Sequence, residues 1–325
     1  MTLGQLETFL AVARTGSVHA AAALRVVSDA SVSAAVAALE RELGAPLLER
    51  RGRGIRLTPA GEELARYAAQ ALGLLEQGRS AVHAASRPGH GRLRLAAVTT
   101  AGEYLIPPIL SAFRRRHPGI EVQLEVGNRG AVLGRLRGRE ADLGIGGRPP
   151  TGGDPAGEPV LPNDLVLIAA AGHPLTKRRT VDAASLAGEV WLLREVGSGT
   201  RATTLELMAA LGVEPPQILT LGSNGSVRQG AIVGLGITLL SEQAVARELA
   251  SGIVARIPAP GLPLHRPWYA LYPGPTVEAG TAALTAPART FLAFLRSREA
   301  KRALAAAEAP SRDRSKVKER AQKSR

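Results

Sequence analysis

The sequence predicts an α+β protein with more than one domain: a small helical domain at the N-terminus, a long helix, and a larger α/β part. Three observations support this prediction. Apolar residues recur at helical spacing in three short segments before residue 58 and along one long segment from residue 59. From residue 92, strand-like runs alternate with helical ones, as in βαβ units. The 325 residues leave room for two or three domains with a sizeable core.

Three short helices are predicted in residues 1–58. The first carries Leu6, Phe9, Leu10 and Ala13, and the second is the alanine-rich segment from Ser17 to Arg25. The third has one apolar stripe, made of Val32, Val36, Leu39 and Leu43. Ser28 or Asp29 can cap this third helix, and Gly44 with Pro46 ends it. Such a trio can be a DNA-binding unit whose last helix enters the major groove, and an ordinary alanine-rich bundle fits the same periodicity.

A short hairpin is expected after the third helix. Leu47–Leu48 and Ile55–Leu57 can pair, with Gly52 and Gly54 in the turn between them. Four arginines project from this hairpin: Arg50, Arg51, Arg53 and Arg56. A run of like charges is usually a solvated surface. Beside a three-helix DNA-binding unit, a hairpin of arginines with glycines at its tip is better interpreted as a wing that grips phosphates or a minor groove.

Residues 59–91 are predicted to form a dimerising linker helix and a hinge. Thr58 caps the helix and Pro59 occupies its first position. Apolar or small residues follow a 4-3-4-3-4 spacing, as in a heptad seam: Leu64, Ala68, Ala71, Leu75, Gly78 and Val82. Gly73 and Gly78 each weaken an isolated helix by about 1 kcal/mol, so we expect a partner helix to offset them. The alternative is a helix packed on its own domain.

The charge of the chain is concentrated at its C-terminus. The formal net charge is +13, of which residues 296–325 carry +7, residues 92–295 carry +4 and residues 1–91 carry +2. We therefore expect residues 296–325 to be a basic, disordered tail, above all from Pro310 onward. The high overall pI is weak evidence for a basic DNA-binding surface.

No catalytic or cofactor motif is found. The chain has no cysteine, which excludes disulfides and thiol catalysis, and its six histidines are scattered without metal-ligand spacing. The segments GSGTR and GIGG lack the spacing of a P-loop or a dinucleotide fingerprint. No signal peptide or membrane-spanning run is recognised. We expect a cytoplasmic protein without cofactor, metal or membrane contact, and not an enzyme.

Several segments carry a resemblance to a known family. The runs FLAVARTGSVHAAA, SDASVSAAVAALE and ELGAPLLERRGRGIRLTPAG resemble, without gaps over about residues 3–66, the winged helix-turn-helix of LysR-type transcriptional regulators. The segments TTAGEY, ADLGIGG, GHPL, GSGTR and GLGITLLS extend the resemblance to about Leu295. GSNGSV and TTAGEY look similar to regulators of the RuBisCO operon, which respond to phosphorylated or nicotinamide metabolites.

The resemblance implies a bacterial DNA-binding transcriptional regulator. Residues 1–58 would be the winged helix-turn-helix, and residues 92–295 a two-lobed, periplasmic-binding-protein-like α/β effector domain. The βαβ pattern of this domain predicts mostly parallel strands. The late strand WYALYP, followed by a helix around Pro287–Leu295, suggests that the chain crosses back to the first lobe. The implied partners are double-stranded DNA, a small anionic metabolite, and further copies of the chain in a dimer or tetramer.

The predicted DNA-binding residues come from the third helix and the wing. They are Ser28, Asp29, Ser31, Ser33 and Ala34, with Arg50, Arg51, Arg53 and Arg56. Where the family usually shows Gln-Pro, this chain has Asp29-Ala30, and Arg25 replaces a frequent leucine. A helix face of serine and alanine offers few long side chains for bidentate base contacts, so we expect specificity to come mainly from the wing, DNA shape and half-site spacing.

The predicted effector site uses three places where a strand runs into a small polar cluster and then a helix. Each place exposes backbone N–H groups of a helix N-terminus beside hydroxyls, which suits an anion, although a single one is usually only a helix cap. Carried over from the resemblance, the expected ligand residues are Thr99, Thr100, Ser198, Thr200, Arg201 and Asn224. Arg148, after the third strand of the α/β part, is a further candidate cation.

Two other functions stay open at this point. One is a solute-binding module whose winged helix contacts a protein partner, and the other is an α/β transferase with the lobes around its active site. The first predicts no affinity for DNA at any salt concentration. The second lacks an evident acid–base or nucleophile pair. The effector, the operator and the sign of regulation cannot be read from the sequence.

Overall fold

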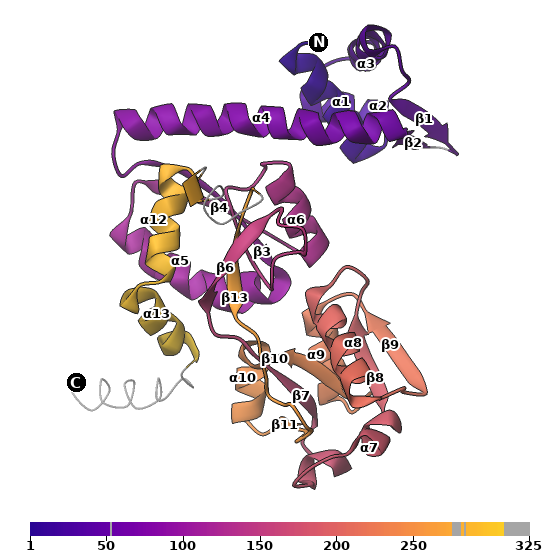
Figure 1. Ribbon diagram of the computed structural model, residues 1–325, viewed down its shortest axis with the longest axis vertical. Helices are drawn as coiled ribbons and strands as arrows, with labels where there is room; N and C mark the ends of the chain where they lie inside the picture. Colours follow the sequence, from indigo (N-terminus) through magenta and orange to yellow (C-terminus); the bar gives the residue numbers. More distant parts are fainter. Residues whose placement is uncertain (53, 275–280, 283, 309–325) are drawn as a thin grey trace, which may run out of the picture.

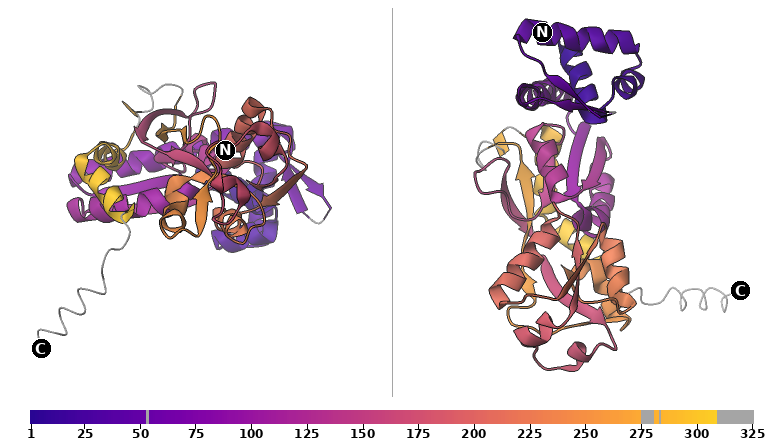
Figure 2. Two further views of the ribbon diagram at one scale, coloured as in Figure 1. Left: turned by 90° about the horizontal axis from the view of Figure 1, so that it is seen from below. Right: turned by 90° about the vertical axis from the view of Figure 1, so that its right-hand side faces the viewer.

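The computed structural model describes residues 1–308 except 53, 275–280 and 283. The molecule is elongated and has three tiers (Figure 1, Figure 2). The N-terminal domain lies at one end, the first α/β lobe in the middle, and the second lobe at the other end. The long helix α4, Pro59–Ser86, runs between the N-terminal domain and the first lobe (Figure 1).

The N-terminal domain contains three helices and a hairpin. They are α1 (Leu3–Thr15), α2 (Val18–Arg25), α3 (Asp29–Leu43), β1 (Leu48–Arg51) and β2 (Gly54–Leu57). Each helix begins at a hydroxyl cap, since the side chains of Thr2, Ser17 and Ser28 accept hydrogen bonds from N–H groups of the first turn. The cap of α3 is therefore Ser28, and Asp29 is the first residue of the helix.

The apolar stripe of α3 packs on α1 and α2. Val32, Val36 and Leu39 are buried in two clusters with residues of these helices. Leu43, predicted as the fourth member of the stripe, is 44% exposed. The reason is that α3 ends there, with Gly44 in the left-handed conformation as its C-cap.

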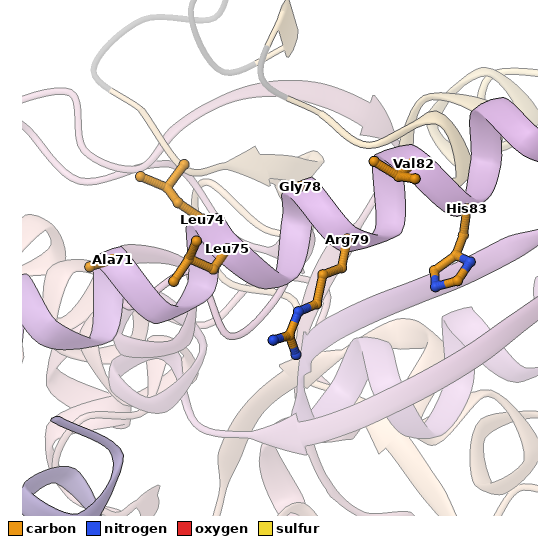
Figure 3. A pocket seen from close by; sticks show the side chains of 7 residues that line it. All are labelled: Ala71, Leu74, Leu75, Gly78, Arg79, Val82 and His83. Carbon is orange, nitrogen blue, oxygen red and sulfur yellow. The ribbon is translucent and has the colours of Figure 1, made fainter. Parts of the chain in front are cut away.

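Helix α4 changes its surroundings along its length. In its first half, Ala68 is buried and Leu64 packs beside it in the core of the N-terminal domain. In its second half, a groove stays open, and it is lined by Ala71, Leu74, Leu75, Gly78, Arg79, Val82 and His83 (Figure 3). The prediction of one dimer seam from Leu64 to Val82 is thus wrong for its first two members, which pack within their own domain. Gly73 faces Arg139 of the first lobe, not a partner helix.

The first lobe is built on a five-stranded sheet in the order β4-β3-β5-β13-β6. Its strands are β3 (Gly91–Val98), β4 (Ile120–Gly127), β5 (Leu143–Gly146), β6 (Ala156–Leu161) and β13 (Trp268–Tyr272). The helical segments of the lobe are η1 (Ala101–Leu105), α5 (Ile106–Arg116), α6 (Arg129–Arg137), α12 (Ala286–Leu295) and α13 (Arg298–Glu308). The return of the chain to this lobe through the WYALYP strand is confirmed, because β13 lies between β5 and β6.

The second lobe contains two groups of strands. One group is β7 (Asp164–Ala170), β10 (Thr238–Ser241), β11 (Val254–Arg256) and β12 (Leu264–His265), and the other is β8 (Val190–Arg194) with β9 (Gln217–Leu221). The helical segments are η2 (Pro174–Lys177), α7 (Ala183–Ala187), α8 (Gly199–Leu211), α9 (Asn224–Ile232) and α10 (Glu242–Ala250). A bridge between Trp191 and Ile237 joins the two groups.

The expectation of mostly parallel strands is wrong for part of the α/β domain. Strand β3 pairs parallel with β4 and β5, and β8 pairs parallel with β9. However, β7 is antiparallel to its three neighbours, and β13 is antiparallel to β5 and β6. Both strands adjoin the two segments at which the chain crosses between the lobes, so they do not come from βαβ units. The crossing segments touch, since the Arg266 N–H donates to the Asn163 carbonyl at 2.8 Å.

The predicted disorder of the C-terminal segment is wrong for residues 298–308, which form α13. Ala300 and Leu304 lie one turn apart on this helix and are buried in the core of the first lobe, where α13 contacts α5. This apolar face, inside a basic segment, explains why the helix is part of the fold. Residues 309–325, which were also predicted as tail, lie outside the described residues.

Within the described part of the chain, no single helix is long and apolar enough to cross a membrane, and one bent pair, α2 with α3, passes that test by length and composition only.

Candidate DNA-binding surface and ligand cleft

The five residues predicted on α3 to contact DNA are exposed. They are Ser28, Asp29, Ser31, Ser33 and Ala34. The Ser28 hydroxyl accepts from the Ser31 N–H at 3.1 Å and lies 2.8 Å from the Ser31 hydroxyl. Asp29 lies 3.3 Å from Nδ1 of His19 on α2. The exposed surface of α3 therefore consists of short, mostly polar side chains, and two of its hydroxyl groups are hydrogen-bonded to each other.

The turn between α2 and α3 departs from an ordinary backbone conformation. Val26 has φ 56° and is 89% exposed, although a β-branched residue rarely adopts the left-handed region. Arg25, just before it, pairs with Glu7 of α1 at 2.7 Å. The Nε of Arg25 is buried and has no hydrogen-bond partner among the described residues.

The wing presents free arginines. Arg50, Arg51 and Arg56 are exposed, and none of them forms an ion pair within the described part of the chain. The pairing of β1 with β2 places Arg50 opposite Ile55 and Arg51 opposite Gly54. Arg53, at the tip, lies outside the described residues. Guanidinium groups that keep their donors free in this way can bind phosphate oxygens.

A carboxylate fixes the wing to α3. The Oε1 atom of Glu40, near the end of α3, accepts from the N–H groups of Leu47 and Leu48 at 2.8 and 3.2 Å. The Ile55 N–H of the wing also donates to the Gly16 carbonyl at 2.9 Å. Sequence reasoning missed Glu40. The only available signal was an acidic residue at the end of a helix whose dipole disfavours it.

In the effector domain, two predicted ligand residues meet across the lobes. The Asn224 amide at the start of α9 donates to the Thr100 hydroxyl, which follows β3, at 2.8 Å. Both side chains are buried, with 2% and 7% of their surface exposed. Ser198 is buried as well and caps α8. Ser198 directly follows Gly197, and a Cβ on Gly197 would lie 3.4 Å from the side chain of Asn128 in the first lobe. The structure therefore brings Thr100, Ser198 and Asn224 to the boundary between the lobes.

A buried arginine completes this boundary. Arg194, the last residue of β8, is 5% exposed and donates to the Asn224 side-chain oxygen. Its Nε and Nη2 donate to the two carboxylate oxygens of Glu195 at 2.7 and 2.9 Å. Burial alone would raise the pKa of Glu195, but the hydrogen bonds from Arg194 lower it below the ordinary value. Sequence reasoning missed Arg194, although a cation ending the apolar strand VWLLR was a usable signal.

The other predicted ligand residues are placed differently. The Arg201 guanidinium donates to the Arg194 carbonyl at 2.9 Å and to the Thr220 hydroxyl at 3.3 Å, so it contacts β8 and β9. The Thr99 hydroxyl donates to the Gly127 carbonyl at 3.2 Å. The Thr200 carbonyl accepts from Thr204. Arg148 is exposed, and its carbonyl accepts from Nη1 of Arg129 at 2.6 Å.

Arg129, which sequence reasoning did not select, is less exposed than the predicted cation Arg148. It is the first residue of α6, directly after Asn128, which caps the helix. Burial, followed by the charge of Arg137, lowers the pKa of Arg129 below its usual range. An arginine at the beginning of a helix opposes the helix dipole, and this was the only signal in the sequence.

A second hydrogen bond crosses the lobes on the same two elements. Nη1 of Arg228 on α9 donates to the Tyr104 hydroxyl on η1 at 2.7 Å. Tyr104 lies four residues after Thr100, and Arg228 lies four residues after Asn224, so η1 and α9 are joined at two points one turn apart. Burial raises the pKa of Tyr104 above its usual range. The segment η1 is a π-helix, a rare form that occurs often at functional sites.

No group of three or more His, Asp or Glu side chains suited to a metal ion is found among the described residues.

Comparisons with known proteins agree with this arrangement. Residues 3–62 match the model of the bacterial regulatory helix-turn-helix protein, lysR family, and residues 86–300 match that of the LysR substrate binding domain. The transcriptional activator CmpR of Synechocystis sp. is 35% identical over 294 residues, which are 90% of this chain and 94% of CmpR. The RuBisCO operon transcriptional regulator of Acidithiobacillus ferrooxidans is 38% identical over 272 residues, 84% of this chain and 88% of that protein.

A solved structure matches the effector domain. The regulatory domain of CcmR from Synechocystis, in complex with 2-PG, has a TM-score of 0.57 and 35% sequence identity. The match covers 63% of this chain and 95% of that domain.

A winged helix-turn-helix joined by a long helix to a two-lobed α/β domain defines a class of DNA-binding regulators with a ligand-binding module. This chain belongs to the LysR family of bacterial transcriptional regulators. Its relatives include regulators of the RuBisCO operon, as the segments GSNGSV and TTAGEY indicate.

Proposed function

We propose that this regulator binds operator DNA through α3 and the wing, and that a small anionic metabolite between its lobes tunes this binding. The observation that carries the proposal is the buried chain of hydrogen bonds from Thr100 through Asn224 to Arg194. A buried guanidinium is costly unless it is paired, and here its partner is the neighbouring Glu195. An anionic ligand can take the place of that carboxylate in charge-assisted hydrogen bonds.

We infer that the ligand carries a phosphate or a carboxylate. The N-terminus of α8, capped by Ser198, adds backbone donors and a favourable dipole beside Arg194. The similarity to the CcmR domain, which was solved with 2-PG (2-phosphoglycolate), supports an anion of this kind. We therefore propose Thr100, Ser198, Asn224 and Arg194 as the residues that hold the ligand, because these four polar side chains are buried close to the lobe boundary. A role for Thr99, Thr200, Arg201 and Arg148 stays a prediction.

We infer that the protein works as a homo-oligomer in the cytoplasm. The open apolar groove of α4, from Ala71 to Val82, supports a dimer in which the α4 helix of a second copy covers the groove (Figure 3). We further propose that two such dimers form a tetramer through contacts between their effector domains. A dimer would present two copies of α3 to a two-fold symmetric operator.

We also infer that the protein acts by binding and not by catalysis. The relatives are named as transcriptional regulators. For the transferase alternative, Glu195 is the acid nearest to the buried cluster, but the lowered pKa keeps it ionised and paired with Arg194. A carboxylate in that state is unsuited to act as a general acid near neutral pH.

The direct test is a thermal-shift and calorimetric titration of the full-length chain with 2-PG, with NADPH as the comparison ligand. At a ligand concentration about 100 times Kd, the melting temperature should rise by about 5 to 10 °C. A response to neither ligand would contradict an anion site between the lobes. Absence of DNA binding at low salt would instead favour the solute-binding module whose winged helix contacts a protein.

A further inference from the structure

Two glycines of α4 have opposite surroundings. A Cβ atom built on Gly73 would lie 2.4 Å from the Cβ and 2.7 Å from the carbonyl oxygen of Arg139 in the first lobe. Such distances are far inside van der Waals contact, so only glycine allows this approach. A Cβ on Gly78, five residues further along, would meet nothing within 4 Å. Gly73 is therefore a docking point between the linker helix and the effector domain.

The neighbours of Gly73 on the same helix face extend the contact. Ala69 and Gln77 lie one turn before and one turn after it. A Cβ on Gly138 would lie 3.5 Å from the Cβ of Ala69, and Nη1 of Arg139 donates to the Gln77 side-chain oxygen at 3.3 Å. We call Ala69, Gly73 and Gln77 the docking stripe. It contacts the turn 138–140 that follows α6.

A third contact reaches the N-terminal domain itself. Arg14, near the end of α1, pairs with Glu140 of the same turn at 2.5 Å, and Glu140 also pairs with Arg135. An exposed ion pair contributes little to affinity, so its main effect is to fix orientation. Arg14 lies two residues before Gly16, whose carbonyl accepts from Ile55 of the wing. The turn 138–140 thus contacts both α4 and the end of α1, and the residues that follow α1 are hydrogen-bonded to the wing.

Helix α6 runs from this turn to the boundary between the lobes. Its cap Asn128 faces the second lobe, since a Cβ on Gly197 would lie 3.4 Å from the Asn128 amide nitrogen. Nη1 of its first residue, Arg129, donates a hydrogen bond to the carbonyl of Arg148. The opposite end of α6 leads into Gly138, Arg139 and Glu140. One short, rigid helix therefore touches the second lobe at one end and the linker helix at the other.

We propose that α6 couples the position of the second lobe to the DNA-binding domain, by docking the turn 138–140 on the docking stripe of the same protomer. The proposal rests on the proposed function, because ligand binding between the lobes would shift α6. A ligand can shift this equilibrium only if it binds the docked and undocked states with different affinity. Docked and undocked proteins must then bind DNA differently.

The undocked state can be obtained with Gly73→Ala, and Gly4→Ala is its control, because Gly4 is an exposed residue of α1 outside both the docking stripe and the open groove. Each change replaces a helical glycine with alanine, but only the first places a Cβ against Arg139, since a Cβ on Gly4 would meet nothing within 4 Å. The assay uses a duplex selected from random DNA by the wild-type protein. We expect Gly73→Ala to change its affinity at least fivefold or to alter its footprint, whereas Gly4→Ala binds like wild type. Equal behaviour of the two variants would overturn the proposal.

The docked state can be locked by a disulfide. The chain has no cysteine, so Ala69→Cys with Gly138→Cys introduces one pair, and the 3.5 Å between the Cβ positions is within the range of disulfides. On oxidation we expect a bond within one protomer, seen as a monomer on a non-reducing gel. The locked protein should differ from Gly73→Ala in DNA affinity at least fivefold, and reduction should remove the difference from wild type.

The outcomes separate this proposal from the proposed function. A failure to cross-link, a bond between two copies, or equal DNA binding by the locked and undocked proteins would refute coupling through the docking stripe. If the two states differ but 2-PG does not move the wild-type protein toward either of them, coupling stands and the proposed ligand chemistry is wrong.

Discussion

The wing and the lobe boundary use arginine in opposite ways. Arg50, Arg51 and Arg56 of the wing are exposed and form no ion pair within the described residues. Arg194 at the lobe boundary is 5% exposed and already satisfied by Glu195 and Asn224. Exposed cations attract phosphate at a distance and are screened by salt, whereas a buried cation binds only what replaces its partner. The wing therefore suits a polyanion of any sequence, and Arg194 suits one small anion of defined shape.

The largest expected effect comes from Arg194→Met. This change leaves Glu195 and Asn224 without their donor, and removing one partner of a buried pair costs about 3 to 5 kcal/mol. The Glu195 side chain is 29% exposed and can be rehydrated, so we expect the loss of unfolding free energy to lie at the lower end of this range. Urea unfolding measures it. Binding of 2-PG should be lost.

The companion variant Glu195→Gln separates stability from ligand binding. In Arg194→Met with Glu195→Gln, the unpaired charge is absent, so much of the stability should return while 2-PG binding does not. The free energy of unfolding of the wild type should also decrease as the pH falls through the lowered pKa of Glu195. This decrease should be absent in Arg194→Met and in the double variant. Retention of 2-PG affinity in Arg194→Met would remove the buried arginine from the ligand site.

The next largest effect is expected at the wing. If Arg50 and Arg51 each contact one phosphate, replacing both with Ala should lower the slope of log K against log salt by about 1.8. At physiological salt this corresponds to a loss of about 30-fold, shared by all duplexes because phosphate contacts carry no sequence information. The measurement is fluorescence anisotropy over a salt series. An unchanged slope would mean that the wing arginines do not touch DNA.

The two regions also differ in how far the sequence revealed them. The three N-terminal helices and the hairpin that follows them are predicted by local spacing, caps and glycine turns, and the structure agrees with these predictions. The DNA contacts of the wing arginines stay a prediction. The lobe boundary depends on contacts between residues such as Thr100 and Asn224, which lie 124 positions apart. Local patterns selected these two and Ser198 because each follows a strand end, and their role in ligand binding stays a prediction. They could not reveal that Arg194 is buried, that Arg201 turns to β9, or that Gly73 serves a docking contact.

A smaller effect is expected for the hydroxyls at the lobe boundary. Thr100→Val removes the acceptor of the Asn224 amide but keeps the side-chain shape, and Ser198→Ala removes the cap of α8. Each hydroxyl that bonds a charged ligand contributes about 1.5 to 3 kcal/mol, so 2-PG affinity should fall about tenfold or more. Ligand-free DNA binding should stay near wild type. Loss of DNA binding without ligand would show that these residues support the fold instead.

The smallest effect is expected at Arg25, whose exposure lies between that of the wing arginines and that of the buried Arg194. Its side chain is 34% exposed and pairs with Glu7, but its Nε is buried without a partner among the described residues. An exposed ion pair contributes about 0 to 1 kcal/mol, whereas an unsatisfied buried donor costs about 1 to 3 kcal/mol. Glu7 is 43% exposed and is readily hydrated once its partner is removed.

The unsatisfied donor therefore outweighs the ion pair at this position. We expect Arg25→Met to raise the free energy of unfolding by about 0.5 to 1 kcal/mol, because it removes that donor and places an apolar atom at the position of Nε. The salt slope of DNA binding should not change, since Arg25 is engaged with α1 and not with the wing. Urea unfolding and the same anisotropy series test both statements. A fall in the slope would place Arg25 among the phosphate-binding arginines, and a loss of stability would show that its pair with Glu7 outweighs the buried donor.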